Sequence, residues 1–170
     1  MSEDSSAVLQ QLSGSIFRLI RGIVRDREMA LDLTQDVLVR MLSRPVPSDP
    51  AQLKSYAMKS AYNAALNAQR DRKRRTRIFE AIQEGAESRS SALPEFDEAD
   101  ESEQTRRLLG DALKQLPAKQ REAVEYRFYG DLKTDEIAAA MNVSSGSVKT
   151  HLYRALNRLS ELLKTTKLEK

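Results

Sequence analysis

The side chains that most often carry out covalent or metal chemistry are almost absent from this chain. It has no cysteine and one histidine, His151. Disulfide frameworks, thiol nucleophiles and thiolate metal sites are therefore excluded. A histidine metal site or a Ser-His-Asp triad would lack its other members. We expect no cofactor and no bound metal, and we rank an enzyme below any binding function because no acid, base and nucleophile occur together.

Charged side chains, which are suited to binding, are abundant and are separated into blocks. Residues 1–43 hold five basic and six acidic side chains, and residues 44–78 hold nine and two. Residues 79–103 hold one basic and nine acidic side chains, and residues 104–170 hold thirteen basic and eight acidic ones. Two basic blocks around an acidic one indicate two modules that face nucleic acid, joined by a polyanionic linker. The alternative is a pair of solvated helix faces around an acidic loop.

The strongest local pattern is a helix-turn-helix over residues 134–156. Ile137 and Met141 face inward from a short first helix, and Asn142 occupies a turn where positive φ is expected. Val148 and Leu152 then close the apolar side of the second helix. That helix leaves a polar face suited to phosphates and base edges in a major groove, made of Ser147, Lys149, Thr150, Tyr153 and Arg154. His151 is interpreted as a partly exposed neighbour of the DNA backbone, and a plain helical hairpin is the alternative.

Helical periodicity accounts for the rest of the chain, and no segment alternates like a strand. Apolar spacing predicts helices between residues 8 and 42, with Asp26 capping the second. Prolines break the pattern at residues 44–50, and further helices are predicted over about 51–77, 104–115, 118–128, 134–141 and 145–163. Thr134 and one of Ser144 and Ser145 are the predicted caps of the last two. The fold class is therefore all-α, with two small helical domains.

The acidic block is predicted to lack fixed structure because it is poor in large apolar side chains. A continuation of the preceding helix through Phe79 and Ile82 is the alternative. No apolar run approaches the length of a membrane span, and the N-terminal residues do not resemble a signal peptide. We therefore expect a cytoplasmic protein with no membrane insertion of its own.

Two sets of motifs carry a resemblance to a known family. The segment from Leu116 through Arg127, together with residues 136–138 and 143–155, resembles region four of the extracytoplasmic-function sigma factors of bacterial RNA polymerase. The helix-turn-helix alone is also similar to response-regulator output domains. The first half of the chain distinguishes these two families, since residues 32–42 and 53–67 resemble region two of the same sigma factors.

The resemblance implies a domain organisation and a set of partners. Residues 1–78 are expected to form region two, 79–103 the acidic linker, and 104–170 region four. The function implied is that of an alternative sigma factor, which binds core RNA polymerase and directs it to promoter DNA. An anti-sigma factor is the expected further partner, and no enzymatic activity is implied.

The resemblance also implies roles for individual residues. The surface for the polymerase clamp is expected to comprise Asp32, Leu33, Gln35, Asp36 and Arg40. The surface for the minus-ten element is expected to comprise Tyr56, Lys59, Asn63, Asn67 and Arg70. The minus-thirty-five element is expected to meet the polar face of the second helix and Arg127. Around Arg127, which is predicted to be exposed, we expect Tyr126, Phe128 and Tyr129 to be chiefly core residues.

Two other classes of function stay open at this point. A repressor or activator that binds a symmetric operator by itself would also carry a helix-turn-helix, and it would be expected to form dimers. A helical adaptor with no nucleic-acid function is disfavoured by the two basic blocks.

Overall fold

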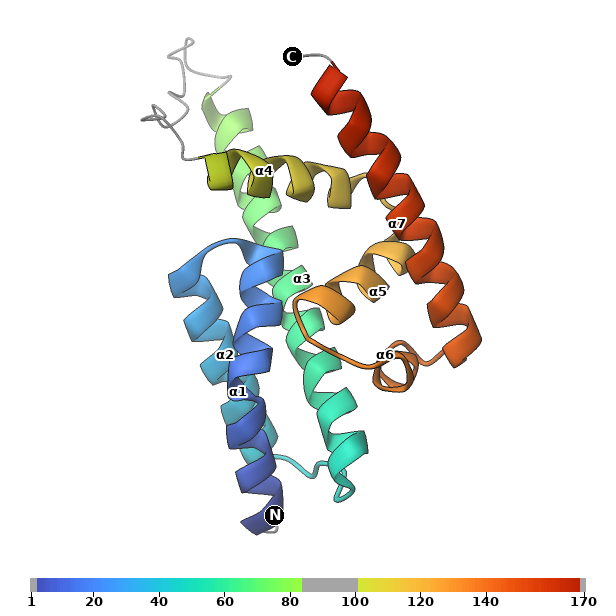
Figure 1. Ribbon diagram of the computed structural model, residues 1–170. Coiled ribbons are helices and arrows are strands. Elements are labelled where there is room, and N and C mark those ends of the chain that lie inside the picture. Colours follow the sequence, from blue (N-terminus) through green and yellow to red (C-terminus); the bar gives the residue numbers. More distant parts are fainter. Residues whose placement is uncertain (1–2, 84–100, 169–170) are drawn as a thin grey trace.

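The computed structural model describes residues 3–83 and 101–168, and this part of the chain is helical with no strand (Figure 1). The expected all-α class is therefore confirmed. The helices are α1 Glu3–Val24, α2 Arg27–Leu42, α3 Pro50–Gln83, α4 Glu101–Lys114, α5 Ala118–Phe128, α6 Thr134–Met141 and α7 Ser145–Leu168. None of these helices is long and apolar enough to cross a membrane.

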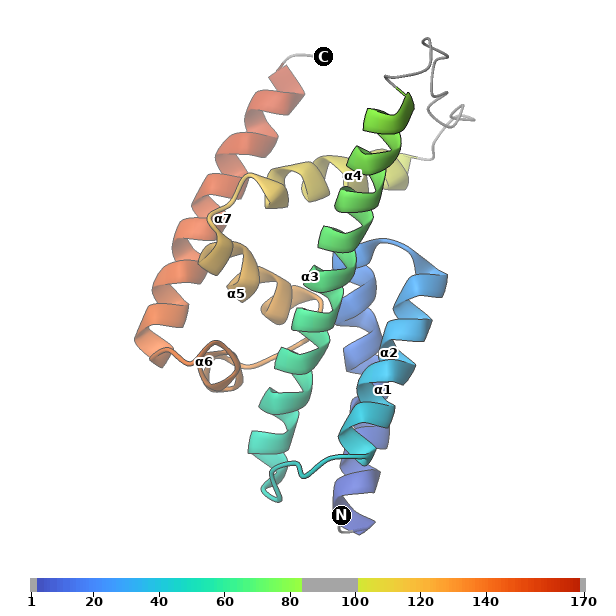
Figure 2. The same ribbon diagram turned by 180° about the vertical axis from the view of Figure 1, so that it is seen from behind.

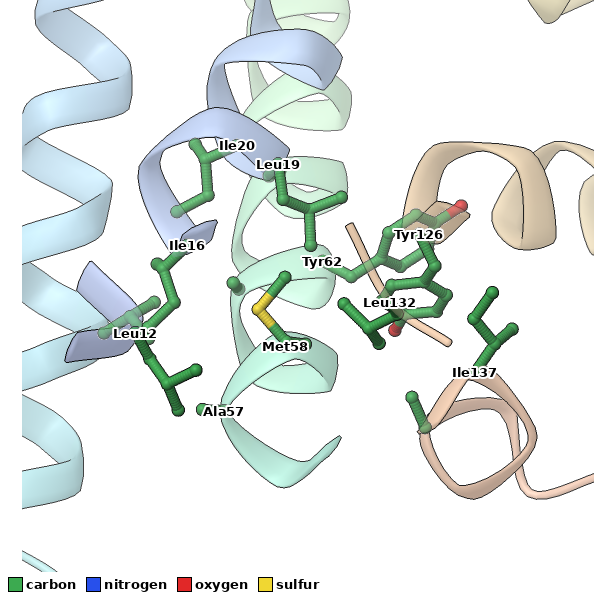
Figure 3. Close-up of a cluster of buried hydrophobic side chains, with 14 of the residues drawn as sticks. Leu12, Ile16, Leu19, Ile20, Ala57, Met58, Tyr62, Tyr126, Leu132 and Ile137 are labelled. Atoms are coloured by element: carbon green, nitrogen blue, oxygen red, sulfur yellow. The ribbon is translucent and has the colours of Figure 1, made fainter. Parts of the chain in front are cut away.

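The first three helices form an N-terminal unit, in which α1 lies along both α2 and α3 (Figure 2). The apolar positions predicted on α1 meet small and apolar residues of α3 (Figure 3). Leu12, Ile16 and Leu19 of α1 are buried, as are Ala57 and Met58 of α3. Small alanines on α3 let the two helices approach closely, so that burial of the α1 stripe supplies much of the hydrophobic stabilisation of this unit.

Local sequence signals define where the N-terminal helices begin. The carboxylate of Asp26 accepts a hydrogen bond from the amide of Met29 at 3.0 Å, which confirms the predicted cap of α2. Asp49 does the same for α3, accepting from the amide of Gln52 at 2.8 Å. The proline-rich break is confirmed, and Pro50 is the first residue of α3, where its missing N–H is tolerated.

The helix-turn-helix is formed by α6 and α7. Asn142 has φ 54° and ψ 51°, which is the predicted left-handed conformation. Ile137, Met141 and Val148 are buried and Leu152 is half-buried, as the sequence pattern predicted. Ser144 caps α7, because its hydroxyl accepts from the amide of Ser147 at 3.1 Å.

The predicted cap of α6 is wrong. The helix begins at Thr134, and its hydroxyl accepts a hydrogen bond from the Arg127 guanidinium at 2.7 Å instead of capping the helix. The carboxylate of Glu136 reaches back to the amide of Lys133 at 2.7 Å. A side chain inside the first turn therefore satisfies the amide of Lys133, the residue just before the helix.

Helices extend into both ends of the acidic block, residues 79–103. Helix α3 continues to Gln83, which confirms the alternative of a helix through Phe79 and Ile82. Helix α4 already begins at Glu101, so residues 101–103 are helical where no fixed structure was expected. The central residues 84–100 of the predicted linker lie outside the described residues.

The C-terminal unit of α4 to α7 packs directly on the N-terminal unit. Helix α6 lies against α3, and α5 contacts α1. Tyr126, Leu132 and Ile137 belong to the same buried cluster as the α1 and α3 side chains (Figure 3). We call this packing the closed arrangement. A second, smaller cluster joins α4, α5 and α7 within the C-terminal unit.

Candidate polymerase and nucleic-acid interfaces

A polar stripe runs along the exposed side of α2. Asp32, Gln35, Asp36 and Arg40 are all exposed, while Val37 is buried against the rest of the N-terminal unit and Leu33 is half-buried. The spacing of three and four residues places the four polar side chains on one face of the helix. We call Asp32, Leu33, Gln35, Asp36 and Arg40 the clamp stripe.

A second exposed face lies on α3. Its members recur at helical spacing and are all exposed, whereas Ala57, Met58 and Ala61 on the other side are buried. We call this the minus-ten face, made of Tyr56, Lys59, Asn63, Asn67 and Arg70. Tyr56 is 44% exposed, which leaves an aromatic side chain available for stacking. The Arg70 guanidinium donates to the amide oxygen of Asn67 at 3.5 Å.

The third face is on α7, and we call Ser147, Lys149, Thr150, Tyr153 and Arg154 the recognition face. Lys149, Thr150, Tyr153 and Arg154 are exposed, and Ser147 is half-buried. Two hydroxyls already have partners: Thr150 donates to the carbonyl of Gly146 at 3.1 Å, and the Ser147 hydroxyl lies 2.9 Å from that of Ser144. Lys149 and Arg154 therefore have the charged groups best placed to reach a DNA groove.

The end of α5 differs from the sequence-based expectation. Phe128 is 62% exposed, so its predicted place in the core is wrong, whereas Tyr126 is buried and Tyr129 is half-buried. The reason is that α5 ends at Phe128 and the chain then turns Tyr129, the residue after the helix, inward against Gly22 of α1. Arg127 was expected to be exposed, but it is half-buried and donates to Thr134.

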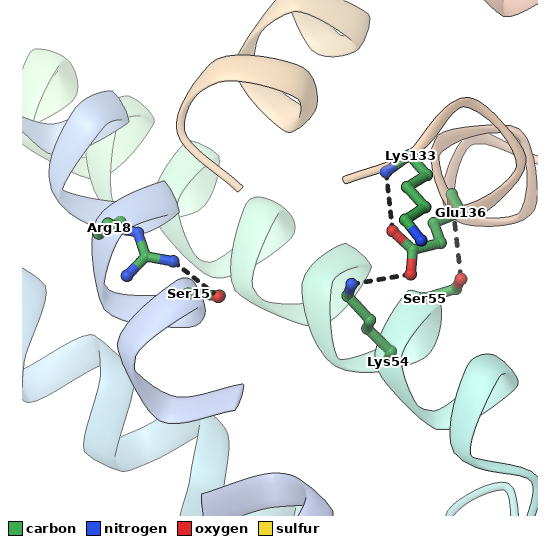
Figure 4. A network of polar contacts seen from close by, with 6 residues as sticks. All are labelled: Ser15, Arg18, Lys54, Ser55, Lys133 and Glu136. Carbon is green, nitrogen blue, oxygen red and sulfur yellow. Dashed lines mark hydrogen bonds and ion pairs between the residues drawn. The ribbon is translucent and has the colours of Figure 1, made fainter. Parts of the chain in front are cut away.

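Polar contacts join the two units where α6 meets α3 (Figure 4). The Lys54 ammonium donates to the Glu136 carboxylate at 2.7 Å, and the Ser55 hydroxyl donates to the Glu136 carbonyl at 3.4 Å. Burial would raise the pKa of Glu136, but the hydrogen bonds from Lys54 and from the Lys133 amide outweigh it and hold that pKa below its ordinary value. The pair is partly shielded from water, so it is a stronger contact than an exposed surface ion pair.

An aromatic and acidic group is buried close by. The rings of Tyr62 and Tyr126, one from each unit, have centroids 5.0 Å apart and are tilted by 36°. Glu125 is only 6% exposed, and its Oε2 atom has no hydrogen-bond partner. Burial raises the pKa of Glu125 to about 7, although the Tyr62 hydroxyl and the Arg121 guanidinium oppose the rise.

Comparison with known proteins identifies the family. The pattern of Sigma-70 region 2 matches residues 8–75, and that of Sigma-70, region 4 matches residues 106–159. The RNA polymerase sigma-E factor of Streptomyces coelicolor is 35% identical over 152 residues, covering 88% of this chain and 80% of that protein. The chain is an extracytoplasmic-function sigma factor. Its function is that of an alternative sigma factor, which directs RNA polymerase to promoters for transcription initiation.

Further relatives of this sigma factor support the same family. RNA polymerase sigma factor SigV of Bacillus subtilis is 29% identical, covering 82% of this chain and 79% of that protein. These relatives are transcription regulators rather than enzymes. In fold, the sigma factor is similar to RpoE from Bartonella quintana, solved in complex with the anti-sigma factor NepR, with a TM-score of 0.60, 24% identity and coverage of 96% and 98%. It is also similar to CnrH in complex with the cytosolic domain of CnrY, with a TM-score of 0.61, 16% identity and coverage of 95% and 97%.

The tertiary structure of this sigma factor does not bring the three predicted faces into one site. Each stays on its own helix and is exposed in the closed arrangement. Sequence reasoning did not identify Lys54, Glu136, Tyr62 and Glu125 as contacts between the units. No local signal marks them, since each pairs with a residue at least 60 positions away.

Proposed function

We propose that α1 to α3 form the polymerase-binding and minus-ten-binding domain, and that α4 to α7 form the minus-thirty-five-binding domain. In this proposal residues 1–78 correspond to the first domain, 104–170 to the second, and 79–103 join them, although α3 extends to Gln83 and α4 begins at Glu101. The observation that carries the proposal is that the three faces remain exposed while their apolar neighbours are buried together.

The clamp stripe is the proposed polymerase contact. It combines two carboxylates and one guanidinium on one helix face, and these charged side chains are exposed. A face of this kind is suited to a partner surface with complementary charge, which orients the complex and accelerates its formation.

The minus-ten and recognition faces are the proposed DNA contacts. On α3, Tyr56 offers a stacking surface for an unpaired base, while Lys59 and Arg70 carry charge for the adjacent backbone. On α7, Lys149 and Arg154 reach base edges or phosphates of duplex DNA. Arg127 is a proposed phosphate contact, with part of its donor capacity already used by Thr134.

We also propose regulation by an anti-sigma factor that covers the clamp stripe. One similar solved structure contains the sigma factor RpoE with the anti-sigma factor NepR, and another contains CnrH with the cytosolic domain of CnrY. The chain would act in the cytoplasm, where core polymerase is found. No inducing signal is assigned.

The decisive experiment is reconstitution with purified core RNA polymerase. The full chain should co-purify with core polymerase, and the complex should give run-off transcripts from a subset of a genomic fragment library. The double variant Lys149→Ala/Arg154→Ala should still co-purify but should lose promoter-specific transcripts. A chain that binds operator DNA as a dimer and does not associate with core polymerase would contradict the proposal.

A further inference from the structure

The closed arrangement forms a pocket between the two units that is open to solvent on one side, at the end of α1 and along the C-terminal half of α3. Its volume is about 660 Å³, within the range of small-molecule sites. Both units supply its walls, so it exists only while the units are packed together. We call it the interdomain cavity.

Cationic side chains from α3, α4, α5 and the loop between α1 and α2 line the interdomain cavity, and all of them except Arg121 are exposed. The N-terminal unit contributes Arg25, Arg72, Lys73 and Arg77, and the C-terminal unit contributes Lys114 and Arg121. Among the described lining residues the only carboxylate is Glu125. Lys114 is paired with Asp111 at 2.7 Å, outside the lining. Water screens the repulsion among these exposed cations, and a bound anion would replace that repulsion with attraction to both units.

Two further features indicate what kind of anion fits. Ile23, Val24 and Leu113 give the cavity an apolar wall beside its cations, which suits a ligand with both a ring and charged groups. Arginine guanidinium groups match phosphate geometry through paired hydrogen bonds.

We propose that the interdomain cavity binds a small molecule carrying two or more phosphate groups, and that this ligand stabilises the closed arrangement. Nucleoside polyphosphates and inorganic polyphosphates share the required chemistry. Because cations of both units contact the ligand, binding must shift the equilibrium toward the state that holds them together.

The first test measures binding of inorganic triphosphate and of adenosine triphosphate to the full chain by calorimetry, with inorganic phosphate as the single-phosphate control. Arg72→Ala/Arg77→Ala should weaken triphosphate binding at least about tenfold, which is about 1.4 kcal/mol. Arg74→Ala/Arg75→Ala is the matched control, because it removes two exposed arginines of the same helix that do not line the cavity. Equal weakening by both pairs, or no binding of triphosphate, would overturn the proposal. Tighter binding of adenosine triphosphate than of inorganic triphosphate would assign the apolar wall to the base.

The second test measures the arrangement of the two units by energy transfer between labels on each. The chain has no cysteine, so Gln11→Cys and Ser160→Cys on α1 and α7 give two unique labelling positions for energy transfer. Triphosphate should increase the population with high transfer, and the Arg72→Ala/Arg77→Ala background should lose that response. A ligand that binds without changing the transfer distribution would overturn the stabilising role.

An acidic segment of the chain itself is the competing occupant, because Glu95, Asp97, Glu98 and Asp100 precede α4 in sequence. Replacing these four by glutamine and asparagine removes their charge without shortening the chain. Triphosphate affinity changed by less than about threefold supports the small-molecule site. Two results together would instead assign the cavity to that segment. Neutralisation would raise triphosphate affinity tenfold or more, and without ligand the wild type would show high energy transfer while the neutralised chain would not.

Discussion

At the scale of single residues, Asp36 is the centre of the clamp stripe and is exposed on α2. Replacing it with arginine reverses the charge of the stripe without touching the buried face of the helix. We expect Asp36→Arg to weaken binding to core polymerase by at least about 1.4 kcal/mol, a tenfold change. Circular dichroism should show unchanged helical content, and fluorescence titration measures the affinity.

The matched control for Asp36→Arg is Asp71→Arg, which makes the same change of charge at an exposed position of α3. It should leave polymerase affinity within about twofold, since Asp71 lies outside the clamp stripe. Equal affinities of wild type and Asp36→Arg would remove Asp36 from the proposed interface.

Lys149 and Arg154 on α7 are expected to contribute to promoter recognition. Lys149→Ala and Arg154→Ala should each weaken binding to the minus-thirty-five element by roughly 1 to 3 kcal/mol and relax its sequence preference, if the side chain reads a base. Binding titrations against promoter and scrambled duplexes at several salt concentrations measure both effects. A loss that is uniform across sequences, with the salt slope lowered by about one, would show a phosphate contact instead.

Glu125 should make the stability of the protein depend on pH. Its pKa in the folded protein is about 7 against an ordinary value of 4.5, because burial disfavours the carboxylate. A raised pKa gives stability that is fully present below pH 4.5 and is lost as pH rises through about 7. Glu125→Gln should therefore stabilise the protein at pH 8, by up to about 3 kcal/mol.

Chemical denaturation of wild type and Glu125→Gln at pH 6 and pH 8 tests this expectation. The wild type should lose stability between the two values, and the variant should lose less. Identical pH dependence in the two proteins would show that Glu125 is not the group responsible.

At the scale of elements, Gly22 determines how closely α1 and the end of α5 approach. A Cβ atom at Gly22 would overlap the ring of Tyr129, whereas a Cβ at Gly14 of the same helix would meet only the Arg18 side chain, at 3.7 Å. Both replacements by alanine favour the helix by about 0.5 to 1 kcal/mol. At Gly22 we expect the added methyl group to overpack against Tyr129, which should lower the free energy of unfolding by roughly 1 to 3 kcal/mol and separate the units.

Gly14→Ala is therefore the matched control for Gly22→Ala. The control should raise the free energy of unfolding and leave the energy-transfer signal between Gln11→Cys and Ser160→Cys unchanged. Gly22→Ala should shift that signal toward lower transfer. Equal gains in stability with unchanged transfer in both variants would show that close α1–α5 packing does not maintain the closed arrangement.

At the scale of the whole molecule, the closed arrangement is too compact for simultaneous promoter binding. A compact chain of this length is about 40 to 50 Å across, whereas promoter elements two helical turns apart are separated by about 70 Å. Both units can reach their elements only after they separate. In the proposed mechanism core polymerase binds the separated state and holds it open.

The free chain should therefore protect a two-element promoter little better than the minus-thirty-five element alone, and the holoenzyme should protect both elements. Footprints of each species on one fragment at fixed salt measure this. Strong protection of both elements by the isolated chain would contradict the requirement for polymerase and favour a self-sufficient regulator.

Sequence by itself determined the helices, most of their boundaries and the helix-turn-helix. These features depend on interactions within a few residues: the Asp26 cap, the left-handed turn at Asn142, and apolar spacing that places Ile16 and Val148 inward. The exposed polar faces on α2, α3 and α7 follow from the same periodicity. The functional resemblance also lay in these local motifs, so the family was predictable before the fold was known.

Only the tertiary structure decided how the two units meet. Tyr62 with Tyr126 and Lys54 with Glu136 are distant in sequence, and no periodic pattern pairs them. Burial of Glu125 also results from this packing, because isolated α5 would leave its carboxylate in water. The interdomain cavity has the same origin, since its cations come from both units and converge only when the units close.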